Sequence, residues 1–263
     1  MPDVFPIEGF LLAMAVYVAE YRLLAIVNIT ITITILFFLV KRYSEKVRIV
    51  MHVYYAALTL YTPFLLIWYL NSVRGEPEAL LNRFYQLIGL RGLPPGMVSE
   101  GIQIPGFLFS SLSILFFVLT IVGVIFWLYD IKKRDTVYDY SGMPRWQKIL
   151  TLLLVFYALT YFHSFLFGVY FAVVGGVPPP LFSQYGLWSC PSNLLFVAIL
   201  APLVPRVNKP LYVSICVNAI IAPVLQQGIA PIAVNLDALS VLPAGLYGLI
   251  MMWRSNKKTR TPP

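Results

Sequence analysis

The chain has 263 residues, of which 59% are hydrophobic and 11% are charged, and its formal net charge is +8. Soluble domains carry about 25% charged residues, so this composition excludes a chain whose whole surface faces water. The basic excess does not indicate a nucleic-acid partner, because Lys and Arg cluster at the ends of apolar runs, as they do in membrane proteins. We therefore expect a multi-pass protein of the cell membrane whose main partner is the lipid bilayer.

The apolar runs predict an all-α fold, a polytopic transmembrane helical bundle of about seven spans. The predicted spans cover residues 23–40, 49–70, 104–129, 149–174, 187–204, 211–227 and 236–253. They form one membrane domain over 1–253, followed by a basic cytoplasmic tail over 254–263. In the first span, Thr30 and Thr34 share a face, and we expect their hydroxyls to bond back to the helix backbone.

Two further segments are predicted to be interfacial. Residues 7–19 are apolar but too few to span a bilayer, so they form either a surface helix or a re-entrant turn. Apolar residues recur at helical spacing within 80–88, with polar residues opposite, which predicts an amphipathic helix in the interface. A stiff Gly-Pro-rich turn over 175–180 joins the fourth and fifth spans.

The distribution of basic residues predicts the orientation of the spans. Most of the 19 Lys and Arg residues follow the first, third, fifth and seventh spans. Basic loops face the cytoplasm, so we expect the N-terminus outside and the C-terminus inside. All five tryptophans lie at predicted span ends, as in an interfacial belt, namely Trp68, Trp127, Trp146, Trp188 and Trp253.

His163 is predicted to lie in the middle of the fourth span. An ionisable group at that depth indicates a functional site, and the alternative is a neutral histidine bonded to a nearby hydroxyl or carbonyl. The other histidine, His52, lies near the cytoplasmic end of its span, so the two cannot face each other across a haem. With two histidines and two cysteines, we expect neither a metal nor another cofactor.

The acidic residues do not indicate charge-coupled transport. A carrier driven by protons or sodium ions normally has a carboxylate at membrane depth. Here Glu20, Asp130 and Asp237 map to span ends, where we expect interfacial anchoring or helix capping. A retinal pump is also disfavoured, because the seventh span has no lysine for a Schiff base.

The fifth span opens with the sequence from Cys190 to Asn193. In a structural interpretation, Pro191 suits the first helical turn and Ser189 caps it. In a functional interpretation, a thiol, the Ser192 hydroxyl and free amide hydrogens lie at a positive helix end facing the outside, where an anion or a polar head group could bind. Cys190 and Cys216 are predicted near opposite sides of the bilayer, which excludes a disulfide between them.

Polar and helix-breaking residues concentrate in the last three spans. Short, broken helices expose backbone groups to a substrate in many carriers, and kinked packing without a substrate is the alternative. The candidate polar site therefore comprises His163, Cys190, Ser192, Asn193, Asn218 and Gln226.

The segment 161–204 resembles a bacterial and archaeal family of uncharacterised multi-pass membrane proteins. The resemblance rests on the turn Gly176-Val177-Pro178, on Pro180-Leu181-Phe182, and on the Cys190-Pro191 helix opening. Family members similarly show a Gly-x-Pro turn, a Leu-Phe-Gly segment and a Pro-Cys-Pro-Thr-Thr opening. This chain departs from them at Gln184, at Ser189 and at Ser192-Asn193. The resemblance implies an all-helical membrane fold and transfers no catalytic residue.

These observations leave three hypotheses for the function. The first is a non-catalytic accessory or scaffold subunit that assembles with other membrane protein subunits, because no catalytic motif accompanies the many small and aromatic residues. The alternative is a facilitator or binding protein for a small neutral or anionic solute. The third is a membrane enzyme, which nothing in the sequence specifically favours.

Overall fold

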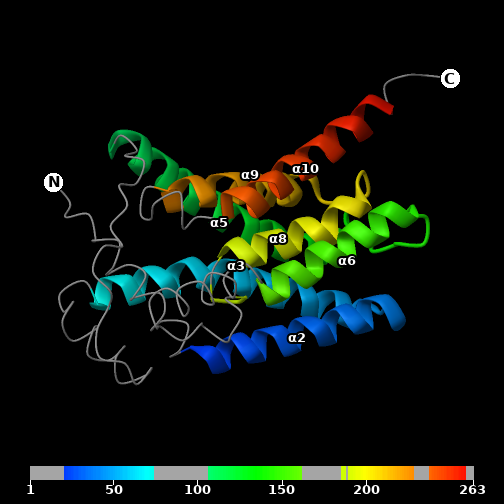
Figure 1. Cartoon of the computed structure of the whole chain (residues 1–263). Helices are drawn as coiled ribbons and strands as arrows, with labels where there is room; N and C mark the ends of the chain where they lie inside the picture. The colour runs from blue at the N-terminus through cyan, green and yellow to red at the C-terminus, as the bar shows by residue number, and fades with distance from the viewer. Residues whose placement is uncertain (1–20, 74–105, 162–184, 188, 228–236, 259–263) are drawn as a thin grey trace, which may run out of the picture.

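The computed structural model describes residues 21–73, 106–161, 185–187, 189–227 and 237–258, and these residues are all-helical apart from turns and loops (Figure 1). The α-helices are α2 (Arg22–Lys41), α3 (Glu45–Val73), α5 (Gly106–Lys133), α6 (Arg145–Thr160), α8 (Ser189–Leu200), α9 (Lys209–Gln227) and α10 (Asp237–Lys258), and a 3-10 helix, η1, covers Ala201–Leu203. The predictions for 7–19, 80–88 and 175–180 concern residues outside this description.

Five of the described helices begin and end close to the predicted spans, and two differ. The helix predicted over 149–174 is not continuous, because α6 ends at Thr160 and Tyr161 adopts a left-handed conformation with φ 45° and ψ 51°. The helix predicted over 187–204 is divided into α8 and η1. Pro202 lies at the start of η1, where its missing N–H favours a local change of helix type.

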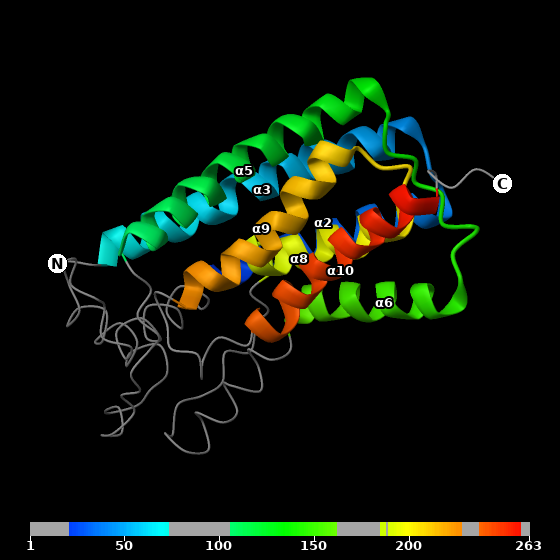
Figure 2. The ribbon, with the colours of Figure 1, turned by 90° about the horizontal axis from the view of Figure 1, so that it is seen from above.

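Successive helices run in opposite directions, as Figures 1 and 2 show. Helix α3 packs on α5, α5 on α9, and α9 on α10, while α8 contacts α3, α6, α9 and α10. Every residue from Cys190 to Leu200 is buried. A helix that is apolar on all sides is expected in the interior, so α8 is the centre of the bundle.

Helix α2 is attached to the bundle by a network of hydroxyl groups. Tyr54 of α3 donates to both the Asn28 carbonyl and the Asn28 side chain, at 3.0 and 3.1 Å. Thr32 bonds the Tyr185 hydroxyl at 2.9 Å, and Tyr61 donates to the Gly186 carbonyl at 2.8 Å. Asn28 and Thr32 are the buried polar residues of α2, and these bonds satisfy them.

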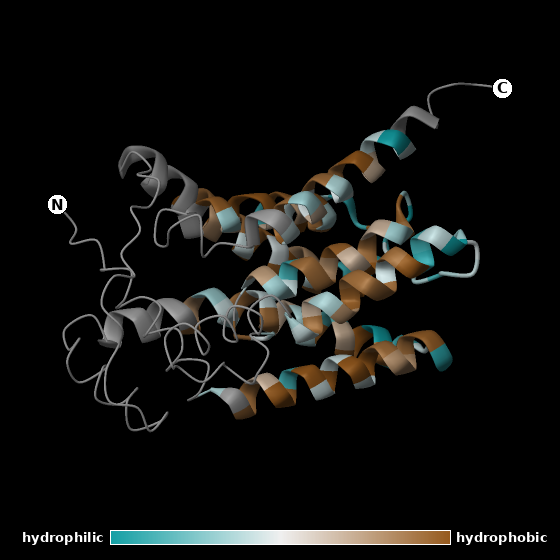
Figure 3. Cartoon of the chain, viewed as in Figure 1, coloured by the Kyte–Doolittle hydropathy of each residue, from teal (hydrophilic) through white to brown (hydrophobic). Residues whose placement is uncertain are grey.

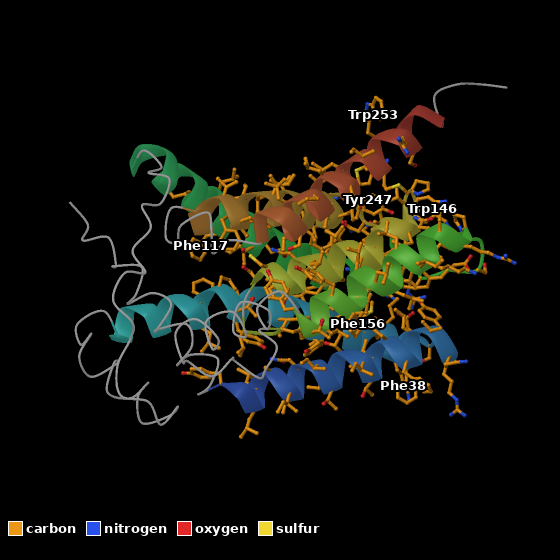
Figure 4. The ribbon with its side chains drawn as sticks, in the orientation of Figure 1. Phe38, Phe117, Trp146, Phe156, Tyr247 and Trp253 are labelled. Atoms are coloured by element: carbon orange, nitrogen blue, oxygen red, sulfur yellow. The ribbon has the colours of Figure 1, made fainter. Side chains whose placement is uncertain are left out.

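The outward faces of the bundle are apolar (Figure 3). The most exposed large side chains are Leu23 and Val40 on α2 and Leu152 on α6, at 68–71% exposure. Figure 4 shows Phe38 and Phe156 on these outward faces. Two helical segments, Leu23–Lys41 and Ile114–Lys133, are long and apolar enough to cross a membrane, which is weak evidence for membrane association.

The tryptophan prediction is confirmed for two of the three tryptophans whose side chains are described, while Trp188 and the side chain of Trp68 lie outside the described part of the chain. Trp146 and Trp253 are 56% and 57% exposed near the ends of their helices (Figure 4), as an interfacial belt requires. Trp127 is completely buried, so its assignment to a belt was wrong. It packs among His52, Tyr55 and Phe196, which lie far from it in the sequence, so the local pattern does not reveal its burial.

One end of the bundle collects the basic residues. The ends of α2, α5 and α10 meet the starts of α3, α6 and α9 there (Figures 1 and 2). The loop 134–144 is fixed to this end by a Val137 N–H to Arg206 carbonyl bond of 3.0 Å and by an Arg206–Asp139 ion pair of 3.3 Å. Hydrogen bonds from the Ser141 hydroxyl and amide, followed by that from Arg206, lower the pKa of Asp139.

Two glycines set the separation of α9 and α10. A Cβ on Gly245 would lie 2.7 Å from the Cys216 carbonyl oxygen, and one on Gly248 would lie 3.0 Å from the Tyr212 hydroxyl. Tyr212 also donates to the Gly248 carbonyl at 3.0 Å. Small residues of this kind let helix backbones approach closely.

We predict that Gly245→Ala lowers the stability of the protein by about 1–3 kcal/mol, because the added methyl group forces the two helices apart. Gly142→Ala is the matched control, since a Cβ there meets nothing within 4 Å. Thermal unfolding of the two variants in one detergent measures the difference. Equal midpoints would show that the α9–α10 contact is not close-packed.

Candidate functional site

A row of buried side chains runs along the inner face of α3. Arg48, His52, Tyr55, Thr59 and Thr62 follow one another at alternating spacings of four and three residues, and each is at most 9% exposed. This spacing places them on one face of the helix. The face spans about 21 Å at 1.5 Å per residue.

Helix α5 presents a complementary row in the opposite direction. Phe116, Thr120, Gly123, Trp127 and Asp130 are all buried and repeat at the same spacing. Because α3 and α5 are antiparallel and in contact, the start of one row lies beside the end of the other. We call the buried polar side chains of these two rows, with those of α8 and α9 that join them, the polar column.

At the basic end of the column, His52 and Asp130 form a buried pair. Their Nε2 and Oδ2 atoms are 2.8 Å apart, and neither side chain is exposed. The other ring nitrogen, Nδ1, is 2.8 Å from the Arg48 carbonyl, which can only accept, so Nδ1 carries a proton. A second proton must lie between Nε2 and Oδ2. The pair is therefore either imidazolium with carboxylate or imidazole with carboxylic acid, with no net charge in either form.

Arg48 covers the end of α5 beside this pair. Its guanidinium donates to the carbonyls of Asp130 and Ile131 at 2.8 and 2.6 Å. The Asp130 carbonyl also accepts from the Arg134 N–H at 2.9 Å, so Arg48 is its second donor. The Ile131 carbonyl belongs to the last turn of the helix, where carbonyls lack intrahelical partners. Glu45 binds the same guanidinium through both oxygens, at 2.7 and 3.2 Å, and balances its charge.

The expectation that Asp130 anchors α5 in an interface is wrong. Its side chain is completely buried, and its Oδ1 accepts a 3.1 Å hydrogen bond from the Thr136 N–H beyond the helix end. The carboxylate therefore holds the segment beyond α5 and pairs with His52, and it caps no open group of the helix end, because those groups are carbonyls. The sequence separates His52 and Asp130 by 78 positions, and no local pattern joins them.

The middle of the column is filled by three aromatic rings, Tyr55, Trp127 and Phe196, which we call the aromatic plug. Their ring centroids lie 4.9–5.5 Å apart. The Tyr55 hydroxyl and the Trp127 indole N–H have no hydrogen-bond partner among the described residues. The Trp127 and His52 rings pack edge to face with their centroids 5.3 Å apart, so the aromatic plug contacts the His52–Asp130 pair.

Beyond the plug lies a small polar cavity between α3, α5, α8 and α9. Its lining residues are Thr59, Thr62, Phe116, Thr120, Ser189, Ser192, Asn193, Phe196 and Asn218. Its volume of about 10 Å³ is close to the lower limit for one water molecule. The cavity thus combines hydroxyl and amide groups with two phenylalanine rings in a space of molecular size.

Two side-chain amides of the lining have atoms without a partner among the residues that the structure describes. They are the Asn193 Nδ2, a donor, and the Asn218 Oδ1, an acceptor, and both residues are 4% exposed. The orientation of Asn218 follows from Thr120, whose hydroxyl donates to the Phe116 carbonyl at 2.9 Å. The Thr120 oxygen can then only accept, and the Asn218 Nδ2 faces it at 3.5 Å.

The threonines of α3 offer acceptors too. Thr59 donates its hydroxyl proton to the Tyr55 carbonyl at 2.7 Å, and Thr62 donates to the Leu58 carbonyl at 2.9 Å. The lone pairs of these oxygens remain for a guest. On the outer face of α2, Thr30 and Thr34 bond back in the same way at 2.8 Å, which confirms the sequence prediction for that pair.

The structure brings together three of the six residues of the predicted polar site. Ser192 and Asn193 from α8 and Asn218 from α9 line the cavity. Cys190 is buried beside them without lining it, and it forms no disulfide with Cys216, as predicted. His163 and the side chain of Gln226 lie outside the described part of the chain.

The expected helix start at Cys190 and Pro191 is present, but its side chains are buried in the protein and not exposed at its surface. Cys190 to Asn193 are all buried, and the first turn of α8 faces the interior cavity. Thr59, Thr62 and Thr120 line the cavity although the sequence pattern did not single them out. The i,i+3 spacing of Thr59 and Thr62 within an apolar helix is the signal that could have found two of them.

Comparison with protein-family models, with curated proteins and with solved structures finds no match for this chain. The family resemblance of 161–204 therefore stays a prediction. Functional inference has to start from the polar column itself.

We predict that Asp130→Leu destabilises the protein by about 3–5 kcal/mol, because it leaves one partner of a buried pair alone. Asp130→Asn is expected to cost much less. Its amide oxygen can still accept from Thr136, and its amide N–H can donate to a neutral His52 ring. Chemical or thermal unfolding of both variants checks the ranking, and equal losses would show that the charge itself is required.

We also predict opposite effects for two buried tyrosines. Tyr55→Phe removes a hydroxyl that has no partner among the described residues, so stability should be unchanged or slightly higher. Tyr185→Phe removes the 2.9 Å bond to Thr32 and should cost about 1 kcal/mol. The two unfolding midpoints, compared with the parent protein, measure the difference. A loss for Tyr55→Phe as large as that for Tyr185→Phe would contradict it.

Proposed function

We propose that the chain is a multi-pass membrane protein of about seven spans with its C-terminus in the cytoplasm. Support comes from the apolar outward faces, from the two helices of sufficient length, and from the collection of basic residues at one end of the bundle. Basic residues on a single side are typical of the cytoplasmic face. The seven described α-helices supply one candidate segment for each proposed span.

Within that framework, we propose that the protein binds a small polar solute in the cavity and facilitates its passage. The observation that carries this proposal is the pair of partnerless amide atoms, the Asn193 Nδ2 and the Asn218 Oδ1, at one cavity. An unsatisfied buried polar group costs about 1–3 kcal/mol. A donor and an acceptor facing one space of molecular size are both satisfied when a guest enters.

The column suggests how passage is limited. The aromatic plug separates the cavity from the His52–Asp130 pair, so a solute reaches the basic end only when the plug opens. Three packed rings form a barrier without charge. We therefore expect a slow facilitator whose rate depends on the movement of Tyr55, Trp127 and Phe196.

The hypothesis of an accessory or scaffold subunit stands second. The exposed faces of α2 and α6 fit lipid tails and partner helices equally well, so they do not favour it over the facilitator. Extraction in mild detergent followed by mass spectrometry separates the two. Stoichiometric partners that co-migrate with the chain would favour the accessory subunit.

We predict that Asn193→Ala and Asn218→Ala each reduce solute flux by about tenfold, equivalent to about 1.4 kcal/mol of lost binding. Flux is measured in vesicles of purified protein with a panel of water, urea, glycerol and formate. Thr34→Ala is the matched control, because Thr34 is exposed on the outer face of α2. Unchanged flux in both asparagine variants, with folding intact, would refute the proposal.

A further inference from the structure

The donors and acceptors around the cavity restrict what it can hold, provided that the proposed solute-binding function is correct. Four acceptor oxygens belong to residues that line it. They are the Asn218 Oδ1 and the hydroxyl oxygens of Thr59, Thr62 and Thr120, whose protons are given to backbone carbonyls. The Asn193 Nδ2 is the donor without a partner in the described residues.

An anion does not suit this lining. An anion could accept from Asn193, from the Ser189 and Ser192 hydroxyls and from the start of α8, but it has no hydrogen to donate, so it would leave the Asn218 Oδ1 unsatisfied. The lining contains no Lys, Arg or His among the described residues to balance the charge. The sequence suggested a neutral or an anionic solute, and the lining therefore disfavours the anionic one.

A cation does not suit it either. The Asn193 N–H groups and the first turn of α8 lie at the same cavity, and the start of a helix is its positive end. A metal ion cannot accept a hydrogen bond from Asn193. The lining holds no carboxylate in the described part of the chain, so a buried positive charge would remain unpaired.

Size completes the restriction. The cavity volume of about 10 Å³ is close to the lower limit for one water molecule. Urea and glycerol have several non-hydrogen atoms and would need the four surrounding helices to move apart. The guest must be about as large as water.

From these three restrictions we infer that the ligand of the cavity is a single neutral, water-sized molecule that accepts a hydrogen bond from Asn193 and donates one to Asn218. Water and ammonia share this chemistry. Each has a lone pair for the Asn193 N–H and a hydrogen for the Asn218 carbonyl. Further hydrogens can reach the threonine oxygens, of which ammonia satisfies one more than water does.

The test uses the full-length protein in sealed vesicles, with empty vesicles as the baseline. Water flux is read from light scattering after an osmotic step, and ammonia entry from alkalinisation of a trapped pH dye after ammonium chloride is added. Formate and potassium flux are measured on the same vesicles. We expect water, ammonia or both to exceed the baseline severalfold, and formate and potassium to stay at it.

Variants locate the flux in the cavity. Asn218→Leu removes the acceptor and Asn193→Asp replaces the donor by an acceptor, so each should lower the water or ammonia flux at least fivefold, whereas Thr34→Ala should not. The selectivity of the unmodified protein needs no variant, which keeps the test decisive if a variant fails to fold. The relative rates of water and ammonia identify which of the two is the guest.

The outcomes separate the two levels of inference. Formate or potassium flux that depends on Asn193, without water or ammonia flux, would overturn the neutral, water-sized ligand and leave the solute-binding function standing. Baseline flux for every probe would overturn both. Water or ammonia flux that both cavity variants leave unchanged would show a path elsewhere in the protein and would overturn the cavity as its site.

Discussion

The buried contact between Arg48, His52 and the end of α5 fixes the positions of the other parts. Arg48 donates to carbonyls at the end of α5, and Asp130 binds both His52 and the loop beyond it. The antiparallel register of α3 and α5 follows from this contact, and the register decides which side chains meet further along. Trp127 reaches Tyr55, and Gly123 faces Thr59, because the two helices are aligned at this end.

The helices could be predicted from the sequence because apolar runs report the length of each segment directly. Where the predicted helix ends or the predicted exposure was wrong, the cause was the tertiary structure. The left-handed turn at Tyr161 interrupts an apolar run without any Gly or Pro at that position. Trp127 and Asp130 lie near a helix end and have the composition of an interface, yet both are completely buried. Trp127 packs on Tyr55 and Phe196, and Asp130 binds His52. Contacts between segments so far apart in the sequence leave no periodic trace.

The candidate site, too, was predictable only in part. Asn193 and Asn218 stood out because amides are rare in apolar helices, and they do line one cavity. The threonines did not stand out, since most threonines in such helices bond to their own backbone, as these also do. Their backbone bonds and their role as acceptors are compatible, because one oxygen can donate a proton and still accept two. A sequence pattern shows which residue types are present, whereas the site depends on which oxygen lone pairs are left to accept a hydrogen bond from a ligand.

The shortness of α8 has a consequence for the electrical behaviour of the proposed bundle. Twelve residues of α-helix extend about 18 Å, against roughly 30 Å for a hydrocarbon layer. The far end of α8 is tied to the basic side through the Tyr140 hydroxyl, which donates to the Ile199 carbonyl at 3.0 Å. The first turn of α8 and the cavity then lie inside the hydrocarbon layer, so part of the membrane voltage drops on each side of the cavity. A charged guest would feel about 2.3 kcal/mol per 100 mV over the full crossing, whereas a neutral guest passes without electrical work.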